Sequence, residues 1–177
     1  MLGTESTRYP LRCRVLPTAT VNGVSVDVML DSNVFDELLA DADAFAAVAD
    51  ALDAGYLRVL VTHVQRDQLA ATPDDDKRRR LLTVAALVDP MDVYTAGFIV
   101  DVSTVDEGAL DMNSDLIEAI RPPPSNERHD RDALIAVTAH HYRAILVTGD
   151  GRLVRRCRNV GVASCSLSEL LTVVSTG

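Results

Sequence analysis

Three aspartates occupy positions at which side chains of an α/β protein can meet. Asp31 directly follows the apolar run 24–30, and Asp150 comes two residues after the run 144–148. Asp132 opens a predicted helix that leads back to the second of these runs. Converging carboxylates repel one another, so such a cluster is costly unless a cation joins it. Oxygen ligands select Mg²⁺, Mn²⁺ or Ca²⁺ over Zn²⁺, and the chemistry that follows is metal-assisted phosphodiester hydrolysis.

Alternating strands and helices must position these aspartates. Apolar runs predict strands over residues 24–30, 57–62, 98–102, 144–148 and 162–165. Helical spacing predicts helices over residues 33–39, 42–54, 64–71, 76–87, 115–120, 130–142, 152–158 and 168–174. The alternation predicts an α/β fold of three α/β/α layers, with a central parallel sheet flanked by helices. In such sheets ligands bind outside the carboxyl ends of the strands, which is where the aspartates are expected.

The composition indicates one globular domain, since 47% of the 177 residues are hydrophobic. Residues 1–22 have no clear period and are interpreted as a flexible or weakly packed extension, which leaves 23–177 as the domain. A formal net charge of -9 argues against a protein that coats nucleic acid, but not against an enzyme whose metal ions face phosphate. No apolar run approaches the roughly 18 residues of a membrane span. Because Cys13, Cys157 and Cys165 lack metal-site spacing, we expect reduced thiols in a cytoplasmic protein.

The motifs around the aspartates resemble those of the PIN-domain ribonucleases. The first motif is matched by LDSNV at residues 30–34, a strand end followed by small polar residues. The third and fourth are matched by DALIAVTA at residues 132–139 and by ILVTGDGRL at residues 145–153. The resemblance covers roughly residues 24–171.

This resemblance implies a PIN-like fold and an endoribonuclease that depends on Mg²⁺ or Mn²⁺. The residues it assigns to catalysis and to the metal are Asp31, Asp132 and Asp150. Those it assigns to orienting the aspartates are Ser32 or Asn33, together with Thr148, although these residues are equally suited to capping the next helix or closing a turn. Small single-domain members are often toxins of toxin–antitoxin pairs and often homodimers. The implied partners are therefore RNA, an antitoxin protein and a second copy of the chain.

The second motif departs from the family pattern. PIN domains usually place an acidic residue, often Glu before Leu, in the helix after the second strand. Here that register holds Gln68, and Asp67 comes one residue earlier, about 100° away on a helix. Either Asp67 turns into the site and is catalytic, which we favour, or Gln68 acts as a neutral ligand or positions water. The second option weakens metal binding and favours the alternative function, a catalytically weak PIN-like module that binds RNA or a protein.

Further charged residues lie near the predicted site. Four arginines follow Asp150 and either face solvent or grip phosphates, namely Arg152, Arg155, Arg156 and Arg158. Of these, Arg152 and Arg155 are the predicted RNA contacts. Asp130 is expected to cap the helix that contains Asp132, and Asp36 is a further candidate for the crevice.

Two other classes of strand-end aspartate protein fit less well. An aspartate-based phosphatase needs a second Asp two residues after the first, where this chain has Asn33. A receiver domain needs a lysine near a late strand, and Lys77, the only lysine, is elsewhere.

Overall fold

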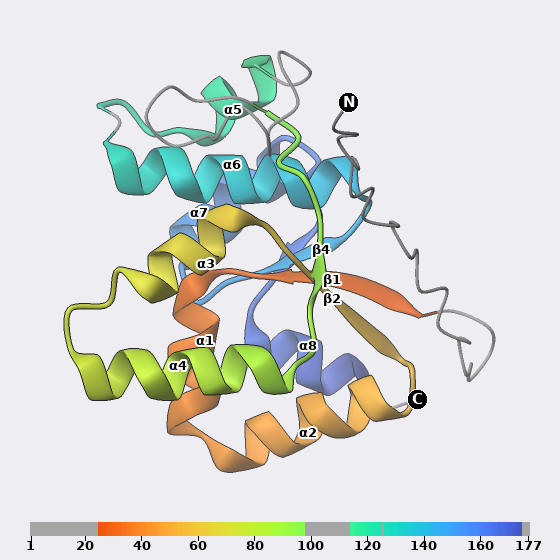
Figure 1. The fold of residues 1–177 in the computed structure, drawn as a ribbon. Coiled ribbons are helices and arrows are strands. Elements are labelled where there is room, and N and C mark those ends of the chain that lie inside the picture. The colour runs from red at the N-terminus through yellow and green to blue at the C-terminus, as the bar shows by residue number, and fades with distance from the viewer. Residues whose placement is uncertain (1–24, 98–113, 125, 175–177) are drawn as a thin grey trace, which may run out of the picture.

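Five parallel strands form the centre of the molecule. The computed structural model describes residues 25–97, 114–124 and 126–174. The strands lie in the order β3-β2-β1-β4-β5 (Figure 1), and each neighbouring pair is parallel. Their bounds are β1 (Val26–Leu30), β2 (Leu57–Val61), β3 (Met91–Asp92), β4 (Ile145–Val147) and β5 (Ser164–Cys165). The helices in these ranges are α1 (Ser32–Ala40), α2 (Ala42–Asp53), α3 (His63–Ala70), α4 (Asp75–Leu87), α5 (Ser114–Ile120), α6 (Glu127–His141), α7 (Gly151–Asn159) and α8 (Leu167–Val174).

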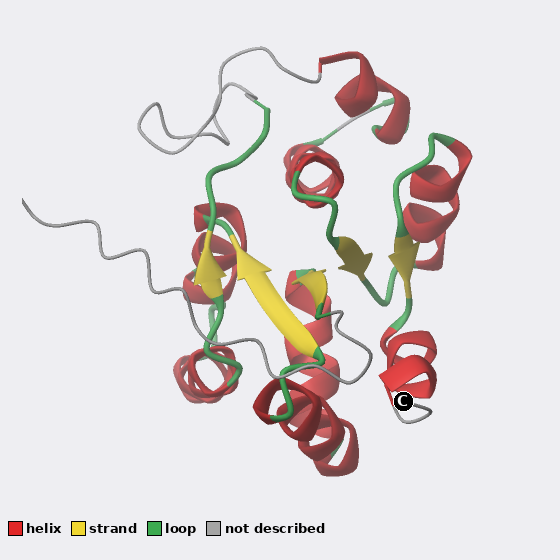
Figure 2. Cartoon of the chain, turned by 90° about the vertical axis from the view of Figure 1, so that its right-hand side faces the viewer, coloured by secondary structure: helices red, strands yellow, loops and turns green. Residues whose placement is uncertain are grey.

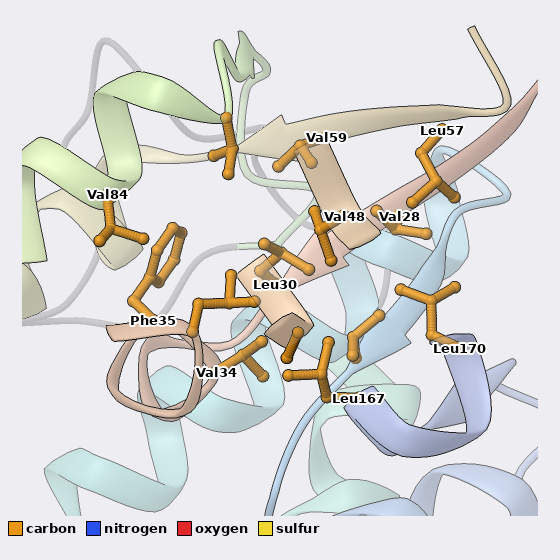
Figure 3. Packing of buried hydrophobic residues seen from close by; sticks show 14 of the residues in the cluster. Val28, Leu30, Val34, Phe35, Val48, Leu57, Val59, Val84, Leu167 and Leu170 are labelled. Atoms are coloured by element: carbon orange, nitrogen blue, oxygen red, sulfur yellow. The ribbon is translucent and has the colours of Figure 1, made fainter. Parts of the chain in front are cut away.

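Helices cover both faces of the sheet, so the predicted three-layer α/β/α architecture is confirmed. Helices α1, α2, α4 and α8 lie on one face and α5, α6 and α7 on the other (Figures 1 and 2). Side chains of β1 alternate between the faces, as the period of a strand requires. Val28 and Leu30 pack with Phe35 in the apolar cluster drawn in Figure 3, whereas Met29 packs with Leu134 of α6 on the other side. Burial on both faces explains why β1 has a nearly continuous apolar sequence.

The order of the strands places a topological switch point between β1 and β4. From β1 the chain moves outward to β2 and β3, and it then returns to place β4 on the other side of β1. Open parallel sheets bind ligands at such a switch point, outside the carboxyl ends of the strands. Asp31 directly follows β1, and Asp150 lies in the turn after β4. The fold therefore brings both residues to the same edge of the sheet.

The edge of the sheet beyond β2 differs from expectation. The predicted strand at 98–102 lies outside the described residues, as does the predicted extension at 1–22. The strand that pairs with β2 is β3, whose two residues are exposed and follow Pro90. So short and exposed a strand has no apolar run, and the periodicity of the sequence could not reveal it.

Helix α6 begins earlier than predicted, at Glu127. Its N-cap is Asn126, whose side chain accepts a backbone N–H of the first turn at 3.0 Å. The expectation that Asp130 caps this helix was wrong, because Asp130 forms an ion pair with Arg121 at 2.7 Å. Asp132 accordingly lies in the second turn of the helix and does not open it.

No helix in the described ranges is both long and apolar enough to cross a bilayer. Cys157 and Cys165 are free thiols, and Cys13 lies outside the described residues. Burial raises the pKa of Cys157 to about 11, so this thiol stays protonated at neutral pH.

Candidate active site

Asp31 stands at the carboxyl end of the central strand. Its backbone N–H donates to the carbonyl of Val147 at 2.9 Å, so β1 and β4 both hold it. Its Oδ1 accepts the N–H of Ser32 at 2.7 Å, and Asp31 is therefore itself the N-cap of α1. Only 2% of the residue is exposed. A carboxylate at a helix N-terminus is favoured by the helix dipole, which helps to keep this buried group ionised.

Thr148 and Asn33 hold the second oxygen of Asp31. The Thr148 hydroxyl donates to Asp31 Oδ2 at 2.7 Å, and Asn33 Nδ2 donates to the same oxygen at 2.8 Å. Thr148 Oγ1 also accepts the N–H of Asp150 at 3.1 Å, and Asn33 Oδ1 accepts the N–H of Gly149 at 3.0 Å. Burial raises the pKa of Asp31, and the hydrogen bond from Thr148 acts in the opposite direction. The turns after β1 and β4 are thus tied together through the Asp31 carboxylate.

Asp150 is the N-cap of α7. Its Oδ1 accepts the N–H groups of Arg152 at 2.8 Å and Leu153 at 3.2 Å. Its Oδ2 makes no hydrogen bond with any residue that the structure describes. The charge of Asp150 raises the pKa of both Asp31 and Asp132. One oxygen of Asp150 therefore caps α7, while the other is free to bind a ligand near the carboxylates of Asp31 and Asp132.

Asp132 is a buried carboxylate without a hydrogen-bond partner. Only 6% of the residue is exposed, and it has no hydrogen bond or ion pair within the described part of the chain. Burial raises its pKa to about 7; the charge of Asp31 adds to the increase, as does Asp150, while Arg128 and Arg156 oppose it. Buried charges in proteins are normally paired or bound to metal ions. Because its pKa is about 7, the carboxyl group of Asp132 is partly protonated at neutral pH.

The helix after β2 buries a glutamine that sequence reasoning missed. Gln65 is fully buried, and its Oε1 accepts the N–H of Thr62 at 2.8 Å and also the Thr62 hydroxyl. Its Nε2 donates to the carbonyl of Leu30 at 3.3 Å. Gln65 therefore joins the ends of β1 and β2 immediately before Asp31. The spacing of Thr62 and Gln65 is that of a capping box, and this signal could have identified the residue.

The two residues weighed for the second motif lie in different surroundings. Asp67 is exposed and has no hydrogen bond or ion pair among the described residues. Gln68 comes one helical turn after Val64, which packs in the cluster on the α6 side of the sheet. The Oε1 of Gln68 is buried and lacks a hydrogen-bond partner in the described part of the molecule. The inward face of α3 thus presents the amide of Gln68.

Glu37 is an acidic residue of the site that sequence reasoning missed. It is half-buried on α1, and burial and the charge of Asp31 both raise its pKa. A Cβ at Gly149 would collide with Glu37 Oε1, so the glycine leaves room for this carboxylate beside the β4–α7 turn. Asp36, the neighbour weighed instead, is exposed and pairs with Lys77 at 2.8 Å. Glu37 follows the asparagine of the first motif by four residues, a spacing that places both on one helix face.

The four arginines of α7 differ in their surroundings. Arg158 donates to Ser164 O and pairs with Glu169 at 3.0 Å, so it is used in the fold. Arg152 and Arg155, the predicted RNA contacts, are exposed, and their side chains form no ion pair with a described residue. Arg156 as a whole is half-buried instead.

Asp132 and the unused oxygen of Asp150 are the groups best suited to hold a cation. Within the described ranges, no set of three or more His, Cys, Asp or Glu side chains encloses a metal site. Mg²⁺ usually takes one or two carboxylates and keeps several of its waters, whereas structural Zn²⁺ takes four protein ligands. An open set of carboxylate oxygens therefore fits Mg²⁺ or Mn²⁺ better than Zn²⁺.

Comparison with known proteins gives the fold. No family model and no curated protein matches the sequence. The chain is similar to the crystal structure of PAE2754 from Pyrobaculum aerophilum, with 15% identity, a TM-score of 0.53, and coverage of 87% of this chain and 100% of that one. Two further solved structures have lower scores. VapBC-1 from nontypeable Haemophilus influenzae has 13% identity, a TM-score of 0.46, and coverage of 81% of this chain and 99% of that one. A domain of a functionally unknown protein from Methanocaldococcus jannaschii DSM 2661 has 13% identity, a TM-score of 0.43, and coverage of 80% and 91%. At these identities the likeness concerns architecture alone, and it agrees with the expected α/β fold of three layers around a parallel sheet.

Proposed function

We propose that this protein is an endoribonuclease that hydrolyses RNA phosphodiester bonds with Mg²⁺ or Mn²⁺. The observation that carries the proposal is the buried carboxylate of Asp132, which has no hydrogen-bond partner among the described residues and faces the charges of Asp31 and Asp150. A cation relieves the repulsion among these groups, which otherwise raises their pKa values. RNA as the substrate rests on the resemblance of the sequence motifs to those of PIN-domain ribonucleases.

Each aspartate has a distinct part in the proposal. Asp132 and Asp150 are the ligands that offer free oxygens, and Asp31, which hydrogen bonds hold in place, adds a third negative charge near Asp132. When bound, the metal activates a water molecule and stabilises charge on the phosphate. Thr148 and Asn33 keep Asp31 in one orientation through hydrogen bonds of 2.7 and 2.8 Å. The proposal assigns no metal to Asp67, because that side chain is exposed.

The toxin–antitoxin role rests on the same sequence resemblance. It adds an antitoxin protein and a second copy of the chain as partners, in the cytoplasm. Light scattering of the purified chain tests the homodimer, and co-purification with the product of a neighbouring reading frame tests the antitoxin.

The decisive experiment is a cleavage assay with matched variants. Purified protein is incubated with structured and single-stranded RNAs in Mg²⁺, in Mn²⁺ and in EDTA, beside Asp31→Asn, Asp150→Asn and Asp50→Asn. Asp50 is exposed on α2 and controls for the loss of one surface charge. The expected result is cleavage with either metal, none in EDTA, loss in the first two variants and full activity in Asp50→Asn. Cleavage that survives in Asp31→Asn and Asp150→Asn would rule the proposed site out.

A second candidate function is favoured by one observation. Gln68 provides an amide where the family pattern has an acid, and this lowers the negative charge available to a metal. If the protein is a catalytically weak module that binds RNA or a protein, the Asp31→Asn variant would bind that partner as well as the wild type does. Binding without cleavage under every metal condition would favour this function over the nuclease.

A further inference from the structure

We propose that Arg128 and Arg156 form a binding site for a backbone phosphate of the nucleic acid, beside the aspartate cluster. The inference rests on the proposed function and adds to it a specific pair of arginines. The sequence indicated Arg156 only as one of four arginines after Asp150, and it did not indicate Arg128. Arg128 belongs to the first turn of α6 and Arg156 to α7, two helices on the same face of the sheet (Figure 1).

Most basic side chains of the described part are used in ion pairs. Those with an acidic partner within 4 Å are Arg58, Arg66, Lys77, Arg78, Arg79, Arg121, Arg131 and Arg158. Arg128 and Arg156 form no such pair with any described residue, even though carboxylates lie near them. Neither positive charge is therefore taken up by an ion pair with a described residue, and both can attract an anion that arrives from outside.

The position of both charges beside the aspartates follows from the helices that carry them. Arg128 precedes Asp132 by four residues on α6, so the two side chains share one face of the helix. Arg156 lies on α7, the helix that Asp150 caps. Both arginines act electrostatically on Asp132, and Arg128 also acts on Asp31. The two charges thus reach the cluster from two separate helices.

Arg156 shows the clearest sign of a missing partner. Its Nε is buried and has no hydrogen-bond acceptor among the described residues. A buried donor of this kind normally has an acceptor. Arginine offers a planar fork of donors that matches two oxygens of a phosphate. A phosphate placed next to the metal-binding carboxylates would pair with the charge of this guanidinium and would also lie where hydrolysis is proposed.

The competing interpretation is that both arginines are only counter-charges for the aspartates. In that case their loss would alter the stability of the protein but not its affinity for RNA. Bound divalent cations would themselves neutralise the carboxylates, which would leave the arginines with no acidic partner in the working site. A phosphate-binding role is therefore favoured for the metal-loaded protein.

The test measures binding separately from cleavage. The full chain carrying Asp31→Asn, which is expected not to cut, is titrated in Mn²⁺ into a fluorescently labelled single-stranded RNA of mixed sequence. Arg128→Ala and Arg156→Ala are each expected to weaken binding about tenfold, as loss of a charge-assisted contact does. Each is also expected to reduce the slope of log K against log salt by about 0.7, the value for one phosphate of a single strand. Arg156→Lys keeps the charge without the fork and should recover part of the affinity.

Arg80→Ala is the matched control. Arg80 is an exposed arginine of α4, on the opposite face of the sheet, and it has no ion pair within the described residues (Figure 1). Its loss should leave both affinity and salt slope unchanged. Melting curves check that each variant is folded, and Arg128 is exposed, so its replacement leaves the core intact.

The possible outcomes separate this inference from the function on which it rests. If the wild-type chain cuts RNA but both arginine variants bind as Arg80→Ala does, the phosphate site is overturned and the nuclease stands. If the wild-type chain neither binds nor cuts RNA, both proposals fall. Weaker binding with a smaller salt slope in the two arginine variants, and not in the control, supports the site.

Discussion

The hydroxyl of Thr148 donates a 2.7 Å hydrogen bond to the carboxylate of Asp31, across a separation of 117 residues. The same oxygen atom of Thr148 accepts the N–H of Asp150 at 3.1 Å. One hydroxyl therefore fixes the distance between two of the three aspartates. Thr148 is itself buried, so no water can easily replace it.

We predict that Thr148→Val lowers the cleavage rate by about 10- to 100-fold, the usual effect of losing a group that orients a metal ligand. Valine keeps the shape of threonine but removes the donor to Asp31 and the acceptor for Asp150. Thr148→Ser, which keeps the hydroxyl, should retain most of the activity. Equal rates for the valine and serine variants, measured on folded protein, would contradict this role.

The pKa of Asp132 leads to a prediction about stability. Burial raises this pKa from 3.8 to about 7, so between these values the folded protein holds a proton that the unfolded chain has released. The contribution of Asp132 to stability therefore decreases as the pH rises from about 4 to about 7, and it no longer changes above pH 7. The full effect is at most a few kcal/mol, since each pH unit contributes about 1.4 kcal/mol.

Asp132→Asn removes this titration. In EDTA, its melting temperature is expected to exceed that of the wild type at pH 8, and the difference should be smaller or reversed at pH 5. Asp50→Asn, an exposed site on α2, should show no such dependence. A difference between Asp132→Asn and wild type that is the same at both pH values would show that Asp132 is ionised throughout.

The aspartates at the strand ends were predictable because their position depends on topology. In a parallel sheet every strand delivers its carboxyl end to the same edge, so Asp31 and Asp150 could be paired without coordinates. The same rule does not say which residues of a helix face that edge. Asp36 and Glu37 differ by about 100° of helix rotation, and only the docking of α1 on the sheet decides that Glu37 faces the site.

Contacts between distant parts of the chain were the least predictable. Arg128 lies before the helix predicted over residues 130–142, yet the structure extends α6 back to Glu127. Its charge then acts on Asp31, which follows a strand in a distant part of the chain, and periodicity alone could not indicate this. Gln65 was overlooked for a related reason, since its importance depends on reaching the carbonyl of Leu30 on a neighbouring strand.

Metal binding should be visible as a change in thermal stability. At Mn²⁺ concentrations about 100 times the dissociation constant, a ligand that binds only the folded state contributes about 2.7 kcal/mol. For a chain of this length that corresponds to an increase in melting temperature of roughly 5–10 °C. The increase should be larger at pH 8 than at pH 6, because the metal must displace the proton of Asp132, whose pKa is about 7.

The same measurement on Asp150→Asn locates the ion. Its Oδ2 is the free carboxylate oxygen beside Asp132, so its replacement should abolish most of the increase. An unchanged increase in this variant would mean that Mn²⁺ binds somewhere else on this acidic protein.

The second motif gives a prediction of increased function. Gln68 lies on the inward face of α3, and its buried Oε1 has no partner among the described residues, whereas Asp67 is exposed. Gln68→Glu should therefore add a carboxylate to the site and increase the cleavage rate at limiting Mg²⁺. It should also lower the melting temperature in EDTA, because a further buried charge then has no cation. Asp67→Asn should change the rate by less than about twofold, as is usual for an exposed side chain without contacts. The opposite pattern, a rate abolished by Asp67→Asn and unaffected by Gln68→Glu, would assign the fourth acidic position to Asp67 and would require α3 to rotate when metal or RNA binds.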